Sequence, residues 1–381
     1  MKILFVTKGY PSEIDPMSGN YEAVQAHAIA ALGHTVTVVC FKWRSLIHLF
    51  DRCSLNYRRS GNVDVYEMEG IIPTFPIISK YVKNYRLEKW MMQMTAKKFA
   101  KKYRELCPLP DVIHIHSQFI AKYTMVLKNC LGVPAVLTEH WSGLNEGAIS
   151  SNIQSEAYIY KEADAVISVS HALQKALRKF YGIESHVVYN MVDDVFFQNL
   201  KTKQNAHFNF VSVGRMVPVK CFENLILAMS FMDHTKDVFL TLVGDGPERL
   251  KLEKLIKEKQ LQNRIILTGL KKPEEVSQIL CQSDCFVLSS HRETFGIVLI
   301  EAMAKGLPVI STRCGGTEDI VNNENGILVE ADNPQEMAKA MDYMIDHYTL
   351  YDSNKIINYC KNNFSQAKVA QQIINIYENV V

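Results

Sequence analysis

Short runs of β-branched and other apolar residues alternate with helix-length amphipathic segments along most of this chain of 381 residues. This alternation is typical of βα units whose strands form parallel sheets. We expect strands in the first half near residues 3–7, 35–39, 63–68, 112–116, 135–139, 165–170 and 186–190. We expect strands in the second half near residues 208–214, 238–244, 264–269, 285–290, 308–312 and 326–330. The pattern therefore predicts an α/β fold.

The polar, unpatterned stretch at residues 198–205 is the best candidate for a linker between domains. At roughly 150 residues per domain, the chain length also favours two domains. We predict two doubly wound, Rossmann-like α/β domains that face each other across a cleft. Residues 1–200 would form the first and residues 201–381 the second, and the C-terminal helix could cross back to the first.

The composition excludes several classes of protein. With 48% hydrophobic and 22% charged residues, the chain is neither disordered nor collagen-like nor a coiled coil. No apolar run approaches the ~18 residues of a membrane-spanning helix. The N-terminus lacks the features of a signal peptide, which predicts a cytoplasmic protein. Nine cysteines with scattered spacing favour reduced thiols over a disulfide framework.

Positive charge is concentrated in the first half of the chain. Residues 41–60 and 80–104 together carry 14 basic and 2 acidic side chains, whereas the rest carries 28 basic and 38 acidic. No basic-aromatic motif for nucleic acid is present, so we expect no nucleic-acid partner. The helix expected over 80–105 is compatible with a core-packed helix that has a solvated charged face. It is also compatible with an interfacial surface on anionic lipid, so region 41–105 is a candidate membrane contact.

The strongest motif is the segment from Glu293 to Glu301. A strand is expected to end just before Glu293 and a helix to begin just after it. Unpaired N–H groups at a helix start bind anions, and Gly296 would let a phosphate approach the backbone. Glu301 would lie about two turns further, ~10–12 Å along the axis, which suits a nucleotide lying along the helix. The alternative is one glutamate that interacts with the helix dipole and a second that is solvated.

Two cationic side chains follow an earlier candidate strand, which ends at Gly214. Arg215 and Lys220 are five residues apart, and these side chains would bind phosphate as a bidentate fork and a point charge. The alternative is two solvated loop cations. Glycine-rich turns at 244–246, 269 and 315–316 follow further strands and would line the carboxyl edge of the same sheet, where open α/β sheets bind ligands.

The first half offers fewer signals. Gly19 precedes a helix and is a candidate backbone anion site. His140 closes a strand and is a candidate polar contact in the cleft, whereas His116 fits a structural histidine better. Neither histidine belongs to a metal-ligand spacing, and Cys281 and Cys285 fit small hydrophobic residues. We expect no metal site and no cofactor.

Taken together, these residues resemble the retaining family-4 glycosyltransferases of the GT-B fold. The resemblance is carried by the Glu293–Glu301 pattern, the Arg215 and Lys220 cations, and the turns at 244–247 and 315–316. It runs nearly continuously over residues 208–346. It is looser in the first half, where it rests on the opening strand, the 18–20 turn and the 138–140 motif. Residues 41–110 carry no motif of the family.

The resemblance implies transfer of a sugar from a nucleotide-diphosphate sugar, with retention of anomeric configuration and no divalent metal. Arg215 and Lys220 would bind the diphosphate, Glu293 would lie beside the donor sugar, Glu301 would hold the ribose, and His140 would lie near the sugar. Backbone contacts to the diphosphate would come from Gly296, Ile297 and Val298, and the nucleobase pocket would lie near Gly269 and Leu270.

The family's N-terminal turn, at the loop for the acceptor or the diphosphate, is usually Gly-Gly, and here it is Ser18-Gly19. Our leading hypothesis is a glycosyltransferase that adds one sugar to a glycan or lipid-linked acceptor in bacterial cell-surface polysaccharide synthesis. It would act in the cytoplasm, at the inner face of the membrane. Two alternatives stay open: a nucleotide-sugar 2-epimerase of the same fold, and a non-catalytic nucleotide-sugar-binding protein.

Overall fold

The computed structural model describes the chain apart from residues 14, 16–17, 46–53, 73–84, 142, 145–152, 199–206 and 233–235. The chain forms two units. The first consists of residues 1–169, 174–189 and 366–381, and the second of residues 170–173 and 190–365. The linker predicted at 198–205 lies almost entirely outside the described residues, so the domain boundary at residue 200 stays a prediction.

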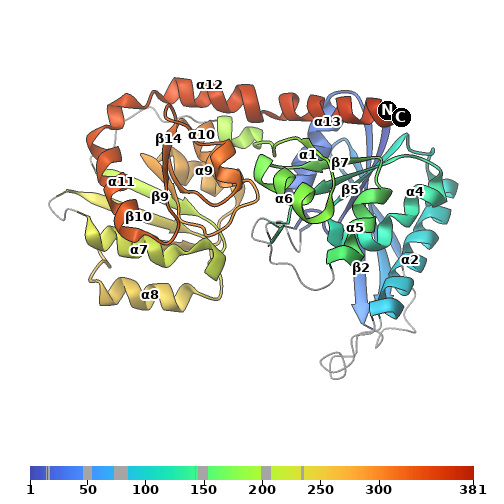
Figure 1. Cartoon of the computed structure of the whole chain (residues 1–381), viewed down its shortest axis with the longest axis horizontal. Coiled ribbons are helices and arrows are strands. Elements are labelled where there is room, and N and C mark those ends of the chain that lie inside the picture. Colours follow the sequence, from blue (N-terminus) through green and yellow to red (C-terminus); the bar gives the residue numbers. More distant parts are fainter. Residues whose placement is uncertain are drawn as a thin grey trace. The chain divides into compact units, whose positions relative to one another are not determined.

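The described part of the first unit contains an eight-stranded sheet in the order β3-β4-β2-β1-β5-β6-β7-β8 (Figure 1). The strands are β1 (Lys2–Thr7), β2 (Thr35–Ser45), β3 (Leu55–Ser60), β4 (Val63–Ile72), β5 (Val112–His116), β6 (Ala135–Glu139), β7 (Ala165–Ser168) and β8 (His186–Val187). All pairs are parallel except β3 with β4. β5 and β6 are buried along their whole length, as expected for central parallel strands covered on both faces.

Helices flank this sheet. They are α1 (Asn20–Ala31), α2 (Tyr85–Leu106), α3 (Gln118–Thr124), α4 (Val126–Leu131), α5 (Ile153–Glu162), α6 (His171–Tyr181) and, from the far end of the sequence, α13 (Gln366–Val380). α13 packs against α1, so both ends of the chain lie in the first unit, as Figure 1 shows. The Tyr377 hydroxyl on α13 lies 2.6 Å from Nδ1 of the fully buried His114, which ties the last helix to the centre of the sheet.

Two expectations for the first unit need correction, and a third lies partly outside the described residues. Residues 41–60 have no clear period in the sequence and no strand was expected in them, but β2 continues to Ser45 and residues 55–60 form β3. The sequence pattern of residues 118–131 predicts one helix, but the structure has a break at Met125 that divides it into α3 and α4. The helix expected from residue 80 is described only from Tyr85, because 80–84 lie outside the described residues. Pairing between β3 and β4, which depends on contacts beyond the local pattern, explains why β3 was missed.

The described part of the second unit contains a six-stranded sheet in the order β11-β10-β9-β12-β13-β14, and its strands all pair in parallel. The strands are β9 (Phe208–Val213), β10 (Val238–Val243), β11 (Ile265–Gly269), β12 (Cys285–Leu288), β13 (Val309–Thr312) and β14 (Gly326–Val329). Each lies within one or two residues of its predicted position. The core between this sheet and its helices is apolar, with Phe210, Leu240 and Ile310 fully buried.

The helices of this unit are α7 (Phe222–Phe231), α8 (Arg249–Glu258), α9 (Pro273–Cys281), α10 (Ile297–Ala304), α11 (Pro334–Asp346) and α12 (Ser353–Phe364). The loops that follow β9, β12 and β13 meet at one edge of the sheet. The His291 N–H donates to the Val219 carbonyl at 2.9 Å, and the Glu293 N–H donates to the Cys314 carbonyl at 3.0 Å. Carboxyl ends of parallel strands share an edge, so these loops bring their side chains together.

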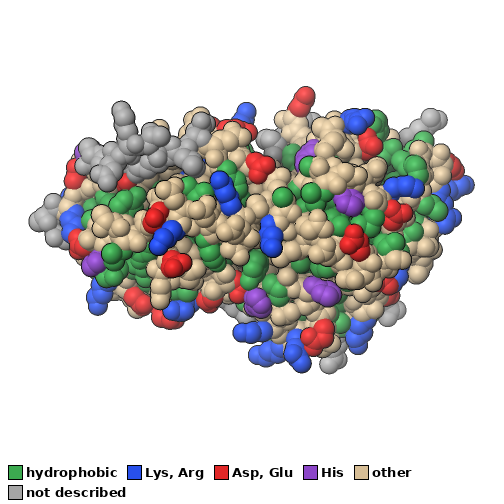
Figure 2. All heavy atoms as spheres, turned by 90° about the horizontal axis from the view of Figure 1, so that it is seen from above, with side chains coloured by type: hydrophobic (Ala, Val, Ile, Leu, Met, Phe, Trp, Pro, Cys, Tyr) green, Lys and Arg blue, Asp and Glu red, His purple; other side chains and the backbone are tan. Residues whose placement is uncertain are grey.

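The face of the molecule seen in Figure 2 is mixed in charge. Figure 2 shows acidic and basic side chains interspersed on the viewed face, with exposed hydrophobic side chains in scattered groups. Among the helices that the structure describes, none is both long enough and apolar enough to cross a bilayer. The eight described cysteines form no disulfide with one another.

Candidate functional site

Lys220 and Glu293 form an ion pair where the loops after β9 and β12 meet. Lys220 ends a 3-10 turn over Pro218–Lys220, and its Nζ lies 2.5 Å from Glu293 Oε1. The same oxygen accepts a hydrogen bond of 2.7 Å from the hydroxyl of Ser290. Both charged side chains are mostly buried, with 25% and 11% of their surfaces exposed. The structure therefore brings together two residues that the sequence predicted independently, and it adds Ser290, which sequence reasoning missed.

The backbone just after Glu293 forms the N-terminus of α10. Gly296 is the residue before the helix and has φ 102°, a left-handed conformation that favours glycine. Ile297 and Val298 are the first helical residues, so their N–H groups have no partner within the helix. The three residues therefore lie at the start of a helix, and the anion site expected there stays a prediction. The helix begins at Ile297, which is later than the sequence suggested.

Glu301 is consequently one turn into α10 rather than two. Its side chain is partly exposed, and burial together with the nearby carboxylate of Asp193 raises its pKa to about 7. Hydroxyl donors would stabilise the charged form of such a carboxyl group, because hydrogen bonds to the carboxylate offset the cost of its desolvation. The spacing thus fits a group that binds next to an anion held at the start of the helix.

Arg215, Gly269 and Leu270 lie on neighbouring loops of the same edge. Arg215 is exposed, and the next N–H, that of Met216, donates to the carbonyl of Asp245 at 2.9 Å. Gly244 and Gly269 form a β-bridge, so the loops after β10 and β11 are joined. Leu270 exposes 69% of its surface, which leaves an apolar side chain available beside that bridge.

The remaining predicted residues, Gly19 and His140, line a cavity in the first unit. This cavity has a volume of ≈ 640 Å³, within the range of small-molecule sites. The loops after β1, β5 and β6 and the first turn of α1 form it. Its walls include five aromatic side chains that sequence reasoning missed, namely Tyr21, Trp43, Phe119, Tyr123 and Trp141.

His140 is positioned by the fully buried Glu139 beside it. Glu139 Oε1 accepts the N–H groups of His140 and Trp141 at 2.8 and 2.9 Å, and Oε2 accepts the hydroxyl of Tyr160 at 2.7 Å. The His140 ring packs on Tyr21, with centroids 4.8 Å apart. Burial lowers the pKa of His140 to about 3, so this imidazole is neutral at physiological pH. A neutral histidine here offers a hydrogen bond without a charge.

His116 requires a correction, because the sequence favoured a satisfied structural histidine. Its Nδ1 lies 3.3 Å from His140 Nε2, but its Nε2 has no hydrogen-bond partner among the described residues. The residue is buried and lines the cavity. The structural role belongs instead to His114, whose two ring nitrogens lie 2.6 Å from Tyr377 Oη and Thr138 Oγ1.

The 18–20 turn explains how the chain accommodates Ser18 in place of glycine. Gly19 has φ 67°, and a Cβ added to it would lie 2.1 Å from the carbonyl oxygen of Gly9. A Cβ added to Gly9 would lie 2.1 Å from Ser18 Oγ. Gly9 therefore provides the space that the Ser18 side chain occupies, and the turn keeps its close approach to the loop after β1.

One group of side chains in the described part of the chain could share a metal ion. The ligand atoms of Cys221, His291 and Asp332 lie within 4.8 Å of one another, and His291 Nδ1 lies 2.8 Å from Asp332 Oδ2. The sequence did not indicate this group, because its members are far apart in the chain. Cys221 directly follows Lys220.

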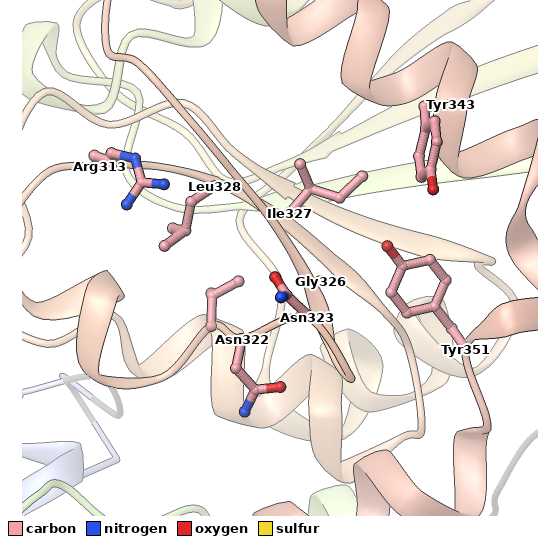
Figure 3. Close-up of a pocket in the computed structure, with 9 residues that line it drawn as sticks. Arg313, Asn322, Asn323, Gly326, Ile327, Leu328, Tyr343 and Tyr351 are labelled. Atoms are coloured by element: carbon pink, nitrogen blue, oxygen red, sulfur yellow. The ribbon is translucent and has the colours of Figure 1, made fainter.

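A second cavity, of ≈ 330 Å³, lies at β14, the edge strand of the second sheet. Figure 3 shows Tyr343 and Tyr351 on one side of this strand and Arg313 on the other. None of the residues that line it was predicted as a site residue. It is separate from the residues around Lys220 and α10.

Comparison with known proteins agrees with the fold and the motifs. The family described as Glycosyltransferase Family 4 matches residues 23–196, and the family described as Glycosyl transferases group 1 matches residues 194–363. The chain is 31% identical over 281 residues to an uncharacterized glycosyltransferase of Methanocaldococcus jannaschii. The matched region covers 71% of this chain and 76% of that protein.

Two further similarities cover more of the chain. It is 29% identical to the glycosyltransferase TuaC of Bacillus subtilis, whose name assigns it to teichuronic acid biosynthesis, over 90% of this chain and 88% of TuaC. The structure of HepE from Anabaena in complex with UDP matches 100% of both chains with a TM-score of 0.73 at 20% identity. The alternation of strands and helices, the two Rossmann-like units and these matches together show that the chain belongs to the family-4 glycosyltransferases with the GT-B fold.

Proposed function

We propose that this enzyme transfers a sugar, with retention of configuration and without a metal ion, from a nucleotide-diphosphate sugar to a glycan or lipid-linked acceptor. The observation that carries the proposal is the Lys220–Glu293 pair beside the N-terminus of α10. A cation and free backbone N–H groups at one place suit a diphosphate that leaves with growing negative charge.

We infer a role for each donor-site residue from its position. Lys220 and Arg215 stabilise charge on the diphosphate as its bond to the anomeric carbon breaks. The N–H groups of Ile297 and Val298 bind the same group, and Glu301 accepts hydrogen bonds from the ribose hydroxyls. The acceptor oxygen forms the new bond to the anomeric carbon, and its proton passes to an oxygen of the leaving phosphate. The protein then acts by positioning and electrostatics.

The donor is best probed first with UDP-sugars, because the structure of HepE was determined with UDP. The name of TuaC supports an acceptor in cell-surface polysaccharide synthesis. Incubation with a radiolabelled UDP-sugar and extracted bacterial glycolipids tests the proposal. Label that moves to the acceptor with release of UDP is the expected result. Conversion of the donor to its 2-epimer would favour the epimerase, and donor binding without turnover would favour a binding protein.

A specific feature of α2 supports action at a membrane surface. Leu87, Trp90 and Met94 are exposed, the last two at 57% and 46%, and their spacing places them on one face of the helix. The exposed Lys97, Lys98 and Lys101 continue the same face toward the C-terminus. Apolar side chains followed by lysines suit the interface of an anionic membrane.

The opposite face of α2 is what holds the helix to the unit. Phe99 is fully buried there, and Met92, Ala96 and Tyr103 are buried with it. The two interpretations of this helix therefore apply to different faces. The buried face packs on the first unit, and the exposed face is the one that we propose contacts anionic lipid.

A further inference from the structure

Cys221, His291 and Asp332 bring a thiol, an imidazole and a carboxylate to one place in the second unit. A ligand atom of each lies within 4.8 Å of the other two. In the part of the chain that the structure describes, no other group of three such side chains is this close. Cys221 ends the loop after β9, His291 lies in the loop after β12, and Asp332 lies in the loop after β14. Three loops at one edge of the sheet therefore contribute one side chain each.

Contacts to the backbone already hold two of these loops together. The His291 N–H donates to the Val219 carbonyl at 2.9 Å. The Ser289 hydroxyl donates to the carbonyls of Lys220 and Cys221, and its oxygen lies 3.0 Å from each of them. The loop after β12 is thus bonded to the loop after β9 on both sides of the cysteine and the histidine. The fold places Cys221 next to His291 before any ion binds.

The carboxylate of Asp332 is oriented by two neighbours. Its Oδ2 lies 2.8 Å from His291 Nδ1, and its Oδ1 accepts a hydrogen bond of 3.3 Å from the side-chain amide of Asn224. Partners that orient a ligand in this way support metal binding. His291 and Asp332 expose 41% and 58% of their side chains, whereas Cys221 is buried. The group is therefore open to an ion from solvent, and a water molecule has room to complete the coordination.

The backbone at position 221 does not account for a cysteine there. Cys221 has φ 49°, a left-handed conformation that favours glycine over residues with a Cβ atom. Its thiol donates to the Pro218 carbonyl at 3.1 Å, and a thiol is a weak donor. Neither the backbone conformation nor this hydrogen bond requires a sulfur atom. A role as a metal ligand would require one.

The types of ligand and their spacing favour zinc. A thiolate, an imidazole, a carboxylate and a water molecule match tetrahedral Zn²⁺, whereas Mg²⁺ and Ca²⁺ prefer oxygen ligands. At zinc–ligand distances of about 2.0–2.3 Å, the ligand atoms of a tetrahedral site lie about 3.3–3.6 Å apart. The separations here are 2.8 Å between His291 and Asp332 and at most 4.8 Å within the group. They differ from the tetrahedral values by about 1 Å, which rotation of the side chains can supply.

We propose that Cys221, His291 and Asp332 bind a Zn²⁺ ion, with a water molecule as the fourth ligand. When the ion binds, the S–H bond of the thiol breaks, its proton passes to solvent, and the sulfur forms a bond to the metal. The ion joins the loops that follow β9, β12 and β14. Its role is structural: it braces the loop that carries Lys220, and the proposed sugar transfer proceeds with or without it. The spacing of residues along the chain did not predict this site, because its ligands come from three separate loops.

Cobalt spectroscopy tests for the bond to sulfur. Full-length protein is treated with EDTA, freed of the chelator, and titrated with Co²⁺ as a coloured substitute for Zn²⁺. Coordination by Cys221 predicts a sulfur-to-cobalt charge-transfer band and the intense visible bands of a four-coordinate ion. An equal concentration of Zn²⁺ should remove these bands, whereas Mn²⁺ should not, because Mn²⁺ has the lower affinity for such ligands. Absence of the charge-transfer band, or its persistence at full strength in Cys221→Gly, would overturn the proposal.

Single substitutions test each ligand by the calorimetric Kd for Zn²⁺. Cys221→Gly suits the left-handed backbone, so this variant should fold. Cys221→Gly and His291→Ala should weaken binding about 100-fold or more, because even groups that only orient a metal ligand contribute about 10–100-fold. Asp332→Asn should weaken binding in the same direction.

His207→Ala is the matched control. His207 also pairs with an exposed aspartate of the second unit, Asp237, but among the described residues it belongs to no group of three ligands. This variant should bind Zn²⁺ as tightly as the parent. A loss in His207→Ala equal to that in His291→Ala would show that any exposed histidine binds the ion, and the assignment would be wrong.

The melting temperature and the transfer activity together test the structural role. A ligand that binds only the folded state, at 100 times its Kd, should raise the melting temperature of the parent by about 5–10 °C. Cys221→Gly should show no such rise. Transfer activity should be the same in EDTA-treated protein and in protein loaded with one equivalent of Zn²⁺. An unchanged melting temperature in the loaded parent, or transfer that is lost when the ion is removed, would contradict the structural role.

Discussion

The ammonium group of Lys220 and the carboxylate of Glu293 lie 2.5 Å apart, although 73 residues separate them in the sequence. The Ser290 hydroxyl donates to the same carboxylate oxygen at 2.7 Å. The lysine is thereby fixed beside the N-terminus of α10 before any ligand binds. Catalysis that depends on electrostatics gains from this arrangement, because a cation already in place needs no reorganisation as charge develops.

Replacing Lys220 by alanine should mainly lower kcat, by about 10²–10³-fold, because the interaction that we propose with the diphosphate would strengthen as this group leaves. Arg215→Ala should act in the same direction. Lys271→Ala is the matched control, since Lys271 also pairs with a glutamate, Glu275 at 3.0 Å, but on the surface of the second unit. Steady-state kinetics with intact circular dichroism is the measurement. Near-native turnover of the Lys220 variant would contradict the phosphate role.

Glu301→Gln should weaken donor binding about tenfold, because the partners that we propose for Glu301 are ribose hydroxyls, which are present in the ground state. The ligand-free carboxyl has a pKa of about 7, and hydroxyl donors favour its charged form. Donor binding should therefore release protons and tighten as pH rises from 6 to 8. Calorimetric Kd values across this range should show the trend in the parent and not in the variant. The same trend in both would exclude Glu301 as its origin.

Chelation with EDTA should leave transfer intact, because the proposed donor site neutralises the diphosphate with Lys220, Arg215 and backbone N–H groups. The Cys221, His291 and Asp332 group makes this test informative. If EDTA abolishes transfer and Mn²⁺ restores it, the metal-free mechanism is wrong. Asp332→Asn would then show whether this group holds the ion, since the variant should require more Mn²⁺ for the same activity.

Changing Lys97, Lys98, Lys101 and Lys102 to glutamate should abolish sedimentation with vesicles that contain anionic lipid. Each lysine near an anionic leaflet contributes ~1 kcal/mol, and salt screens the attraction over ~8–10 Å. The control changes four lysines on or beside α8, Lys251, Lys254, Lys257 and Lys259, which are also exposed. Equal sedimentation of the parent and the α2 variant would place the contact elsewhere. If the parent itself does not sediment, the α2 face is simply solvated.

Burial raises the pKa of Glu22 to about 7, above its usual value of 4.5. The folded protein therefore binds this proton more tightly than the unfolded chain does, and stability falls as pH rises from about 4.5 to about 7. Glu22→Gln should remove this loss, which amounts to about 3 kcal/mol at most. The melting temperature of the variant should thus rise relative to the parent between pH 5 and pH 8. A constant difference over that range would show that Glu22 does not titrate in it.

The fold of the second unit was predictable because its strands are buried parallel runs separated by regular helices. Local periodicity sets such strands, and β9 to β14 lie within a residue or two of their expected places. The register between strands does not follow from periodicity, and neither does an antiparallel addition such as β3. The residues of β3 show only a weak alternation of apolar and polar side chains. Its pairing with β4 is what makes this segment a strand.

In the candidate site, too, features that follow from the local sequence were predictable and features that depend on distant contacts were not. Lys220 and Glu293 were predictable, because each follows a strand whose end lies at the ligand-binding edge. The cavity of the first unit was not, because its walls come from β2, α3 and the loops after β1, β5 and β6. No local pattern in the sequence links these segments to one another.

The position of α13 has a consequence for the order in which the two units fold during translation. The helix is translated after every element of the second unit, yet it covers α1 and supplies the hydroxyl that pairs with His114 in the first sheet. The second unit can complete its own core as soon as residue 365 has emerged, whereas the first must wait with α1 uncovered and His114 lacking that partner. The half of the enzyme that is translated first is therefore the half that finishes folding last.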